Sequence, residues 1–208
     1  MRRFSVHPLN PQRRLMQQAA EQLRDGAVVA MPTDACYVLA CHLGDKAAVD
    51  RLRQIRAIDD KHLLTLMCRD LSELAQYAQV DNRQYRFLKE WTPGAYTFIL
   101  PATKEVPRRL AHPSRKTVGL RVPASPVVQA LLEALGEPVL SSTLIMPGEI
   151  EPLTDPEDIE HRLAKQIDLM IDGEPGRLEP TTVIDMTGDE PMVARVGSGP
   201  IDQMTLVR

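Results

Sequence analysis

Residues 26–34 read Gly-Ala-Val-Val-Ala-Met-Pro-Thr-Asp and combine three structural signals in one short stretch. Gly26 ends an amphipathic segment that begins near Pro11, because glycine readily takes the left-handed backbone that closes a helix. The apolar run 27–31 lacks polar alternation, which is typical of a strand covered on both faces. A hydroxyl and a carboxylate follow in the turn 32–34, where α/β sheets usually bind ligands. The stretch therefore predicts a helix, a buried strand and a candidate site in succession.

A polar side chain precedes a proline at Asn10-Pro11, Ser125-Pro126 and Asp155-Pro156. This pair suits a helix start, because the side chain caps a backbone N–H and proline has no N–H to satisfy. We expect helices over 11–25 and from 126 to Gly136. Strands are expected in the apolar runs, which are 27–31, 63–67, 96–100, 118–122, 139–140, 169–171, 182–184 and 192–196.

Helices and strands interleave in the first two thirds of the chain, and strands dominate near its C-terminus. No internal repeat or linker divides the sequence. The pattern predicts a single α/β (α+β) domain over residues 1–208, built on a large twisted mixed β-sheet with helices packed against it.

Composition narrows the class of protein. The formal net charge of −3 argues against coating nucleic acid with the whole surface, but it allows a local basic patch. No run approaches the ~20 apolar residues that cross a bilayer, so no membrane partner and a cytoplasmic location are expected. Three cysteines without CxxC spacing are expected to be free thiols. The histidines lack metal-ligand spacing, so no structural metal is expected.

The strongest charge asymmetry lies between residues 104 and 121, where Glu105 is the single acidic residue. Such a cluster can contact phosphates, although a solvated face is the alternative. The potential cations are Lys104, Arg108, Arg109, His112, Arg115, Lys116 and Arg121.

Two shorter polar segments are also candidates. Lys61 and His62 precede the buried run 63–67 and could meet an anionic ligand, whereas the arginines at 51, 53 and 56 could line a solvated helix face. The hydroxyls of 141–143 follow a strand and could hold phosphate or carboxylate, although such residues occur in any turn. The turn 32–34 could equally be a cap. The GxxxxGK[ST] phosphate loop is absent, so ATP would be bound by an unusual arrangement.

Five segments in order along residues 27–199 resemble motifs of the YrdC/YciO-like family of threonylcarbamoyl-adenylate synthases. These segments are Met31-Pro32-Thr33-Asp34 with Tyr37, Trp91 to Phe98, Gly119 to Pro123 with Pro126, Pro180 to Asp185, and Arg195-Val196-Gly197. Residues 105–110, Glu-Val-Pro-Arg-Arg-Leu, and Pro180-Thr181-Thr182 look closest to the YciO branch. The resemblance implies a YrdC-like fold with a basic concave surface.

The resemblance also implies a reaction and its partners. Such enzymes condense L-threonine, bicarbonate and ATP, for which Mg²⁺ is a possible companion, and the threonylcarbamoyl group of the adenylate is later transferred to adenosine 37 of tRNA. By the resemblance, threonine is held by Thr33, Arg121, Ser141 and Thr181, and the nucleotide by Arg56, Lys61, Thr143 and Arg195. The basic cluster is the candidate surface for tRNA or double-stranded RNA, through Lys104, Arg108, Arg109, Arg115 and Lys116. No catalytic nucleophile is assigned.

Departures from the family pattern weaken the expected chemistry. Ile58 and Ile145 stand where the family has an arginine and an asparagine, and Val38-Leu39-Ala40 replaces a Gly-Leu-Gly. A lost phosphate donor can cost ~2.7–4 kcal/mol of transition-state stabilisation. Three functions stay open: a weak or altered synthase, a catalytically inactive RNA-binding relative, and a carbamoyl or adenylyl transfer enzyme for another substrate.

Overall fold

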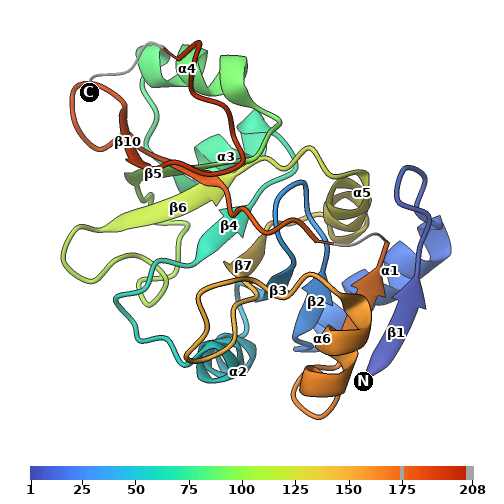
Figure 1. Cartoon of the computed structure of the whole chain (residues 1–208). Coiled ribbons are helices and arrows are strands. Elements are labelled where there is room, and N and C mark those ends of the chain that lie inside the picture. The colour runs from blue at the N-terminus through green and yellow to red at the C-terminus, as the bar shows by residue number, and fades with distance from the viewer. Residues whose placement is uncertain (174–175, 205–208) are drawn as a thin grey trace.

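The computed structural model describes residues 1–173 and 176–204 (Figure 1). The described residues form one sheet of ten strands, in the order β1-β8-β2-β3-β7-β4-β6-β5-β9-β10. The strands are β1 (Arg2–Ser5), β2 (Val29–Met31), β3 (Val38–His42), β4 (Thr65–Met67), β5 (Tyr96–Pro101), β6 (Thr117–Arg121), β7 (Val139–Thr143), β8 (Leu169–Asp172), β9 (Thr182–Asp185) and β10 (Met192–Arg195). The helices are α1 (Arg13–Arg24), α2 (Lys46–Arg56), α3 (Leu71–Tyr77), α4 (Asn82–Trp91), α5 (Pro126–Leu135) and α6 (Pro156–Leu163).

The sheet contains both pairing types. β1 and β2 flank β8 in parallel, β4 pairs with β6 in parallel, and so does β5 with β9. β7 is antiparallel to both of its neighbours, β3 and β4. The predicted mixed α/β fold is therefore confirmed.

Some boundaries differ from the expectation. β1 and β3 were not predicted, and the segment 38–40, interpreted from the sequence as a changed motif, is part of β3. α1 begins at Arg13 with Gln12 as N-cap, so the expected cap at Asn10 is wrong. Ser125 and Asp155 do cap α5 and α6, by accepting hydrogen bonds from backbone N–H groups in the first turn.

Two hydrophobic cores lie on the two faces of the sheet. Alternate residues of β2 belong to different cores: Ala30 is part of the core that includes residues of α2, α3, α4 and α6, whereas Val29 is part of the core that includes residues of α1 and α5. Figure 1 shows α1 and α5 beside each other, over the end of the sheet that holds β2 and β8. The second core takes no residue from β5, β6, β9 or β10. On this face the helices therefore cover one half of the sheet and leave the other half open.

Two further observations bear on the expected class of protein. No helix within the described residues is long and apolar enough to cross a membrane. The three cysteines, Cys36, Cys41 and Cys68, are free and buried.

Candidate functional site

A polar pocket lies on the open half of the sheet. Its main part measures about 220 Å³ and continues into a recess of about 30 Å³ beside Arg121. Strand register explains the floor, because Thr65 on β4 stands opposite both Gly119 on β6 and Ser141 on β7. A Cβ on Gly119 would lie 3.3 Å from the Thr65 hydroxyl oxygen and 3.4 Å from a methyl group of Thr97. Glycine at this position therefore keeps the floor of the pocket open.

Hydroxyl groups form much of the lining. The Ser141 hydroxyl donates to the carbonyl of Thr65 at 3.0 Å, so its hydrogen is already used. The hydroxyls of Thr97 and Thr181 lie 2.8 Å apart, and either can donate to the other. One O–H of this pair therefore remains available to a ligand.

Arg121 lies buried at the small recess and forms an ion pair with Asp34. The second oxygen of Asp34 accepts from the backbone N–H of Ala124 at 3.0 Å. Burial lowers the pKa of Arg121, and Asp34 opposes this shift. Arg121 Nε is buried and has no hydrogen-bond partner within the described part of the chain. Arg121 is thus fixed in place by Asp34 and keeps one donor for a ligand.

Two further arginines reach the pocket from different elements. Arg56 ends α2, is 9% exposed, and donates through Nε to the Ser142 hydroxyl at 3.3 Å. Arg195 on β10 donates to the Thr181 carbonyl at 2.8 Å. Burial lowers the pKa of both guanidinium groups, and neither has a carboxylate partner among the described residues. Arg56 is buried, whereas Arg195 is exposed at the rim. A buried cation without a counter-charge is costly, so an anionic ligand beside Arg56 would stabilise this arrangement.

The structure brings most of the predicted ligand-binding residues to one place. Arg121, Ser141, Thr143, Thr181 and Arg195 line the pocket or its recess, and Arg56 adjoins it through Ser142.

Two predicted residues lie differently. The Thr33 hydroxyl donates to the carbonyl of Cys36 at 2.8 Å and accepts from the N–H of Ala35 at 3.0 Å, so it closes its own turn. Lys61 is exposed and does not line the pocket in the described structure.

Three polar lining residues were missed from the sequence, namely Cys36, Thr65 and Thr97, and His62 was noted beside Lys61 but given no separate role. Thr65 and Thr97 lie inside predicted strands. A threonine in a strand indicates a pocket only if its face of the sheet is free of helices, and the sequence does not show which face that is. Burial raises the pKa of the Cys36 thiol to about 11, although Arg121 and Arg195 act in the opposite direction.

Comparison with known proteins identifies the family. The Sua5/YciO/YrdC family model, described as "Telomere recombination", matches residues 21–197. The chain belongs to this family. YciO of Escherichia coli K12 is 54% identical over 198 residues, which cover 95% of this chain and 96% of that protein. A threonylcarbamoyl-AMP synthase of Vibrio vulnificus is 31% identical over 175 residues, or 82% of this chain and 92% of the synthase.

Solved structures of the family have the same fold. The crystal structure of E. coli YciO superposes with a TM-score of 0.93 and covers 97% of this chain and 98% of that one. P. abyssi Sua5, solved in complex with L-threonine, is 26% identical with a TM-score of 0.86. The match to Sua5 covers 95% of this chain and 58% of the Sua5 chain, so that protein extends well beyond the shared domain.

The isoleucines that depart from the family motifs do not face the pocket. Ile58 is half-buried and packs against the core that holds α2, α3, α4 and α6. Ile145 lies in a bridge with Pro152 and is not among the described lining residues. Val38 does line the small recess, so the replaced Gly-Leu-Gly motif bears on the recess directly.

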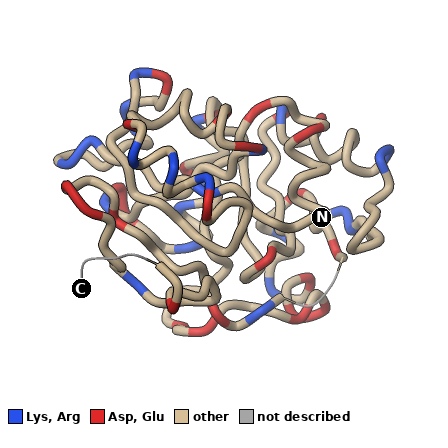
Figure 2. Tube along the Cα trace, turned by 90° about the horizontal axis from the view of Figure 1, so that it is seen from above, with Lys and Arg blue, Asp and Glu red and all other residues tan. Residues whose placement is uncertain are grey.

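The basic cluster lies in the connection between β5 and β6, away from the pocket. All five cations are exposed, and within the described chain none forms an ion pair with a carboxylate: Lys104, Arg108, Arg109, Arg115 and Lys116. Arg109 donates to the carbonyls of Leu43 and Gly44 at 3.2 and 3.1 Å, which holds the segment against the start of α2. Figure 2 shows basic and acidic segments interspersed along the trace, so the cluster is a local feature.

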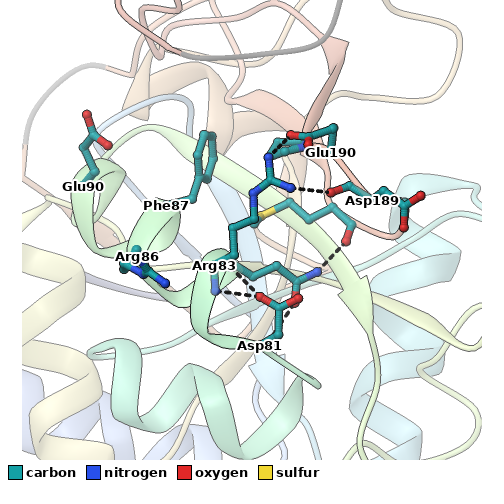
Figure 3. A pocket seen from close by; sticks show the side chains of 11 residues that line it. Asp81, Arg83, Arg86, Phe87, Glu90, Asp189 and Glu190 are labelled. Carbon is teal, nitrogen blue, oxygen red and sulfur yellow. Dashed lines mark hydrogen bonds and ion pairs between the residues drawn. The ribbon is translucent and has the colours of Figure 1, made fainter.

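A larger pocket, of about 530 Å³, lies between α4 and the connection from β9 to β10 (Figure 3). Part of its charged lining is engaged within the protein. Arg83 pairs with Glu190 and donates to the carbonyl of Asp189 at 3.3 Å, and Asp81 caps α4. None of the site residues expected from the sequence lines this pocket.

Proposed function

We propose that the polar pocket binds ATP together with L-threonine and forms L-threonylcarbamoyladenylate from these and bicarbonate, at a low or altered rate. The observation that carries the proposal is Arg56, a buried cation with no described carboxylate partner, beside a hydroxyl-lined pocket. Arg121 and Arg195 add positive charge from two other elements. A bound triphosphate and a substrate carboxylate would supply the missing counter-charges.

The proposed reaction requires positioning and positive charge more than a protein nucleophile. Negative charge spreads over the oxygens of the reacting phosphate in the transition state, and fixed guanidinium groups stabilise it. The available O–H of the Thr97–Thr181 pair can orient a small polar substrate. The similarity to a threonylcarbamoyl-AMP synthase and to Sua5 solved with L-threonine supports this choice of substrates.

The described lining residues include no carboxylate, and no group of three or more His, Cys, Asp or Glu among the described residues could hold a metal ion. Mg²⁺ prefers oxygen ligands, and in nucleotide sites it is bound by one or two carboxylates together with phosphates. The lining therefore does not fit a metal held by the protein. Any Mg²⁺ would enter as part of the Mg–ATP substrate.

A second candidate is carbamoyl or adenylyl transfer to another substrate. The recess beside Arg121 measures about 30 Å³, and Val38 narrows it. A substrate smaller than threonine would require less movement of the lining.

We also propose that the exposed cluster of residues 104–116 binds tRNA or double-stranded RNA through phosphate contacts. Cations without carboxylate partners release counter-ions when they bind a nucleic-acid backbone. The separation between this cluster and the pocket means that RNA binding can persist in a chain without synthase activity.

The direct test is to incubate the protein with ATP, bicarbonate and L-threonine and to detect the adenylate by mass spectrometry. Parallel reactions replace threonine with glycine, alanine or serine. Product from threonine supports the synthase, and product from a smaller amino acid supports the second candidate. RNA binding without ATP binding in an equilibrium assay would contradict both and leave an RNA-binding relative.

A further inference from the structure

His62 lies at the rim of the polar pocket, in the segment that joins α2 to β4. Its backbone N–H donates to the carbonyl and to the side chain of Asp59 at 3.2 and 3.1 Å, which fixes the turn. The imidazole lines the same pocket as Thr181 and Arg195. Within the described part of the chain the ring has no hydrogen-bond partner, so both of its nitrogens remain available to a ligand.

The surroundings of His62 favour a neutral imidazole. His62 is exposed at the rim, and the partial desolvation of its ring in the pocket lowers the pKa of the imidazole below the ordinary value. Arg56 and Arg53 from α2 add to this effect, Asp59 in the same connection opposes it less strongly than these two arginines, and Arg195 from β10 adds a smaller contribution. A histidine with a lowered pKa is unprotonated at neutral pH and can accept a proton.

The other groups at the pocket cannot accept a proton at neutral pH. Guanidinium groups remain protonated, and the Cys36 thiol is held in its neutral form because burial raises its pKa to about 11. The Asp34 carboxylate is engaged by Arg121 and by the N–H of Ala124. No Asp or Glu lines the pocket among the described residues.

We propose that His62 is the general base that activates the amino group of the substrate; this step rests on the proposed synthase or carbamoyl-transfer function. An N–H bond of the substrate ammonium breaks and an N–H bond forms on the imidazole. The freed lone pair attacks the carbon of bicarbonate, a C–N bond forms, and the hydroxyl group departs with a second amine proton as water. The carbamate oxygen then attacks the α-phosphate of ATP, pyrophosphate leaves, and the imidazolium returns its proton to solvent.

The test compares the wild type with His62→Gln and with the matched control His161→Gln, which changes an exposed histidine on α6. Adenylate formation is measured by mass spectrometry from pH 6 to pH 9.5, with kcat and KM determined for ATP and for the amino acid. General-base catalysis contributes about 100- to 10,000-fold, so His62→Gln should lower kcat at neutral pH by roughly 100-fold or more. The loss should shrink as pH rises toward the pKa of the substrate amine, where the amine loses its proton unaided.

The pH profile separates this role from a structural or binding role. A His62→Gln loss that is equal at every pH, or that appears only as a raised KM for ATP, would overturn the proposal. A His62→Gln variant that is as active as the wild type at neutral pH would also overturn the proposal. Added imidazole should partly restore His62→Ala, and failure to do so counts against a base at this position. A wild type that forms no adenylate with any amino acid overturns the proposed function itself, and this step with it.

Discussion

One face of the sheet carries a covered half and an open half that differ sharply, although β4 and β7 contribute side chains to both. Under α1 and α5, β7 contributes Val139 and β4 contributes Met67 to an apolar core. Two residues further along β7, Ser141 lies in the polar pocket, and so does Thr65, two residues earlier on β4. The side chains change from apolar to hydroxyl within two residues on each of these strands. The core therefore holds the pocket floor rigid, because both are parts of the same strands.

The largest expected effect lies in the covered half. Leu131 on α5 is 0% exposed, and Leu131→Ala should lower the free energy of unfolding by about 2–5 kcal/mol through lost burial and a new cavity. Chemical denaturation measures this loss. ATP affinity of the folded fraction should stay unchanged, and a parallel loss of affinity would show that the two halves are not independent.

The opposite pattern is expected in the open half. Arg56→Met keeps an unbranched apolar stem but removes the guanidinium group, a charge that has no described counter-ion, so the unfolding free energy should stay equal or rise. A hydrogen bond to a charged group contributes about 1.5–3 kcal/mol, so ATP affinity should fall by roughly 10- to 100-fold. Calorimetric titration measures this affinity.

Arg86→Met, on the exposed surface of α4, is the matched control. It should leave ATP affinity unchanged. If Arg56→Met lowers the free energy of unfolding by as much as Leu131→Ala and does not alter ATP binding, Arg56 stabilises the fold and does not bind the ligand. The proposed difference between the covered and the open half would then be wrong.

Ile58→Arg tests the interpretation that came from the family motif. The motif suggested that an arginine at this position would restore a phosphate contact, but the side chain packs against the core and Arg56 already adjoins the pocket. We expect a stability loss of about 1–3 kcal/mol from a poorly solvated charge and no gain in adenylate. Thermal melts and product assays measure both, alone and with Ile145→Asn. A gain in product would mean that residue 58 turns toward the pocket when ATP binds.

The sequence predicted the elements that carry one clear feature, either a continuous apolar run or a capping residue followed by proline. Continuous apolar runs located β2, β4, β5 and β6, and a cap followed by proline located the starts of α5 and α6. β1 was missed because it is short and half-exposed and carries two arginines, one of which, Arg3, pairs with Asp172. Thr65 and Thr97 were missed because alternation alone does not tell which face of a strand a helix will cover.

The smallest expected effect concerns the basic cluster. Arg115→Gln with Lys116→Gln should weaken binding to tRNA or duplex RNA by about tenfold or less and reduce the salt slope by about two. Titrations at several salt concentrations measure both quantities. ATP affinity should not change, since the cluster lies outside the pocket. An unchanged salt slope would show that these side chains form only a solvated face.

The central claim is that ligand binding belongs to the open half of the sheet. Amide hydrogen exchange of the wild type with and without ATP tests this claim most directly. The polar pocket and the larger pocket are both candidates for ATP, and different residues border them. We expect ATP to slow exchange in residues 56–65, 119–121, 141–143, 181–183 and 195, which border the polar pocket. Slowed exchange confined to α4 and residues 186–191 would place the ligand in the larger pocket of Figure 3 and contradict the account.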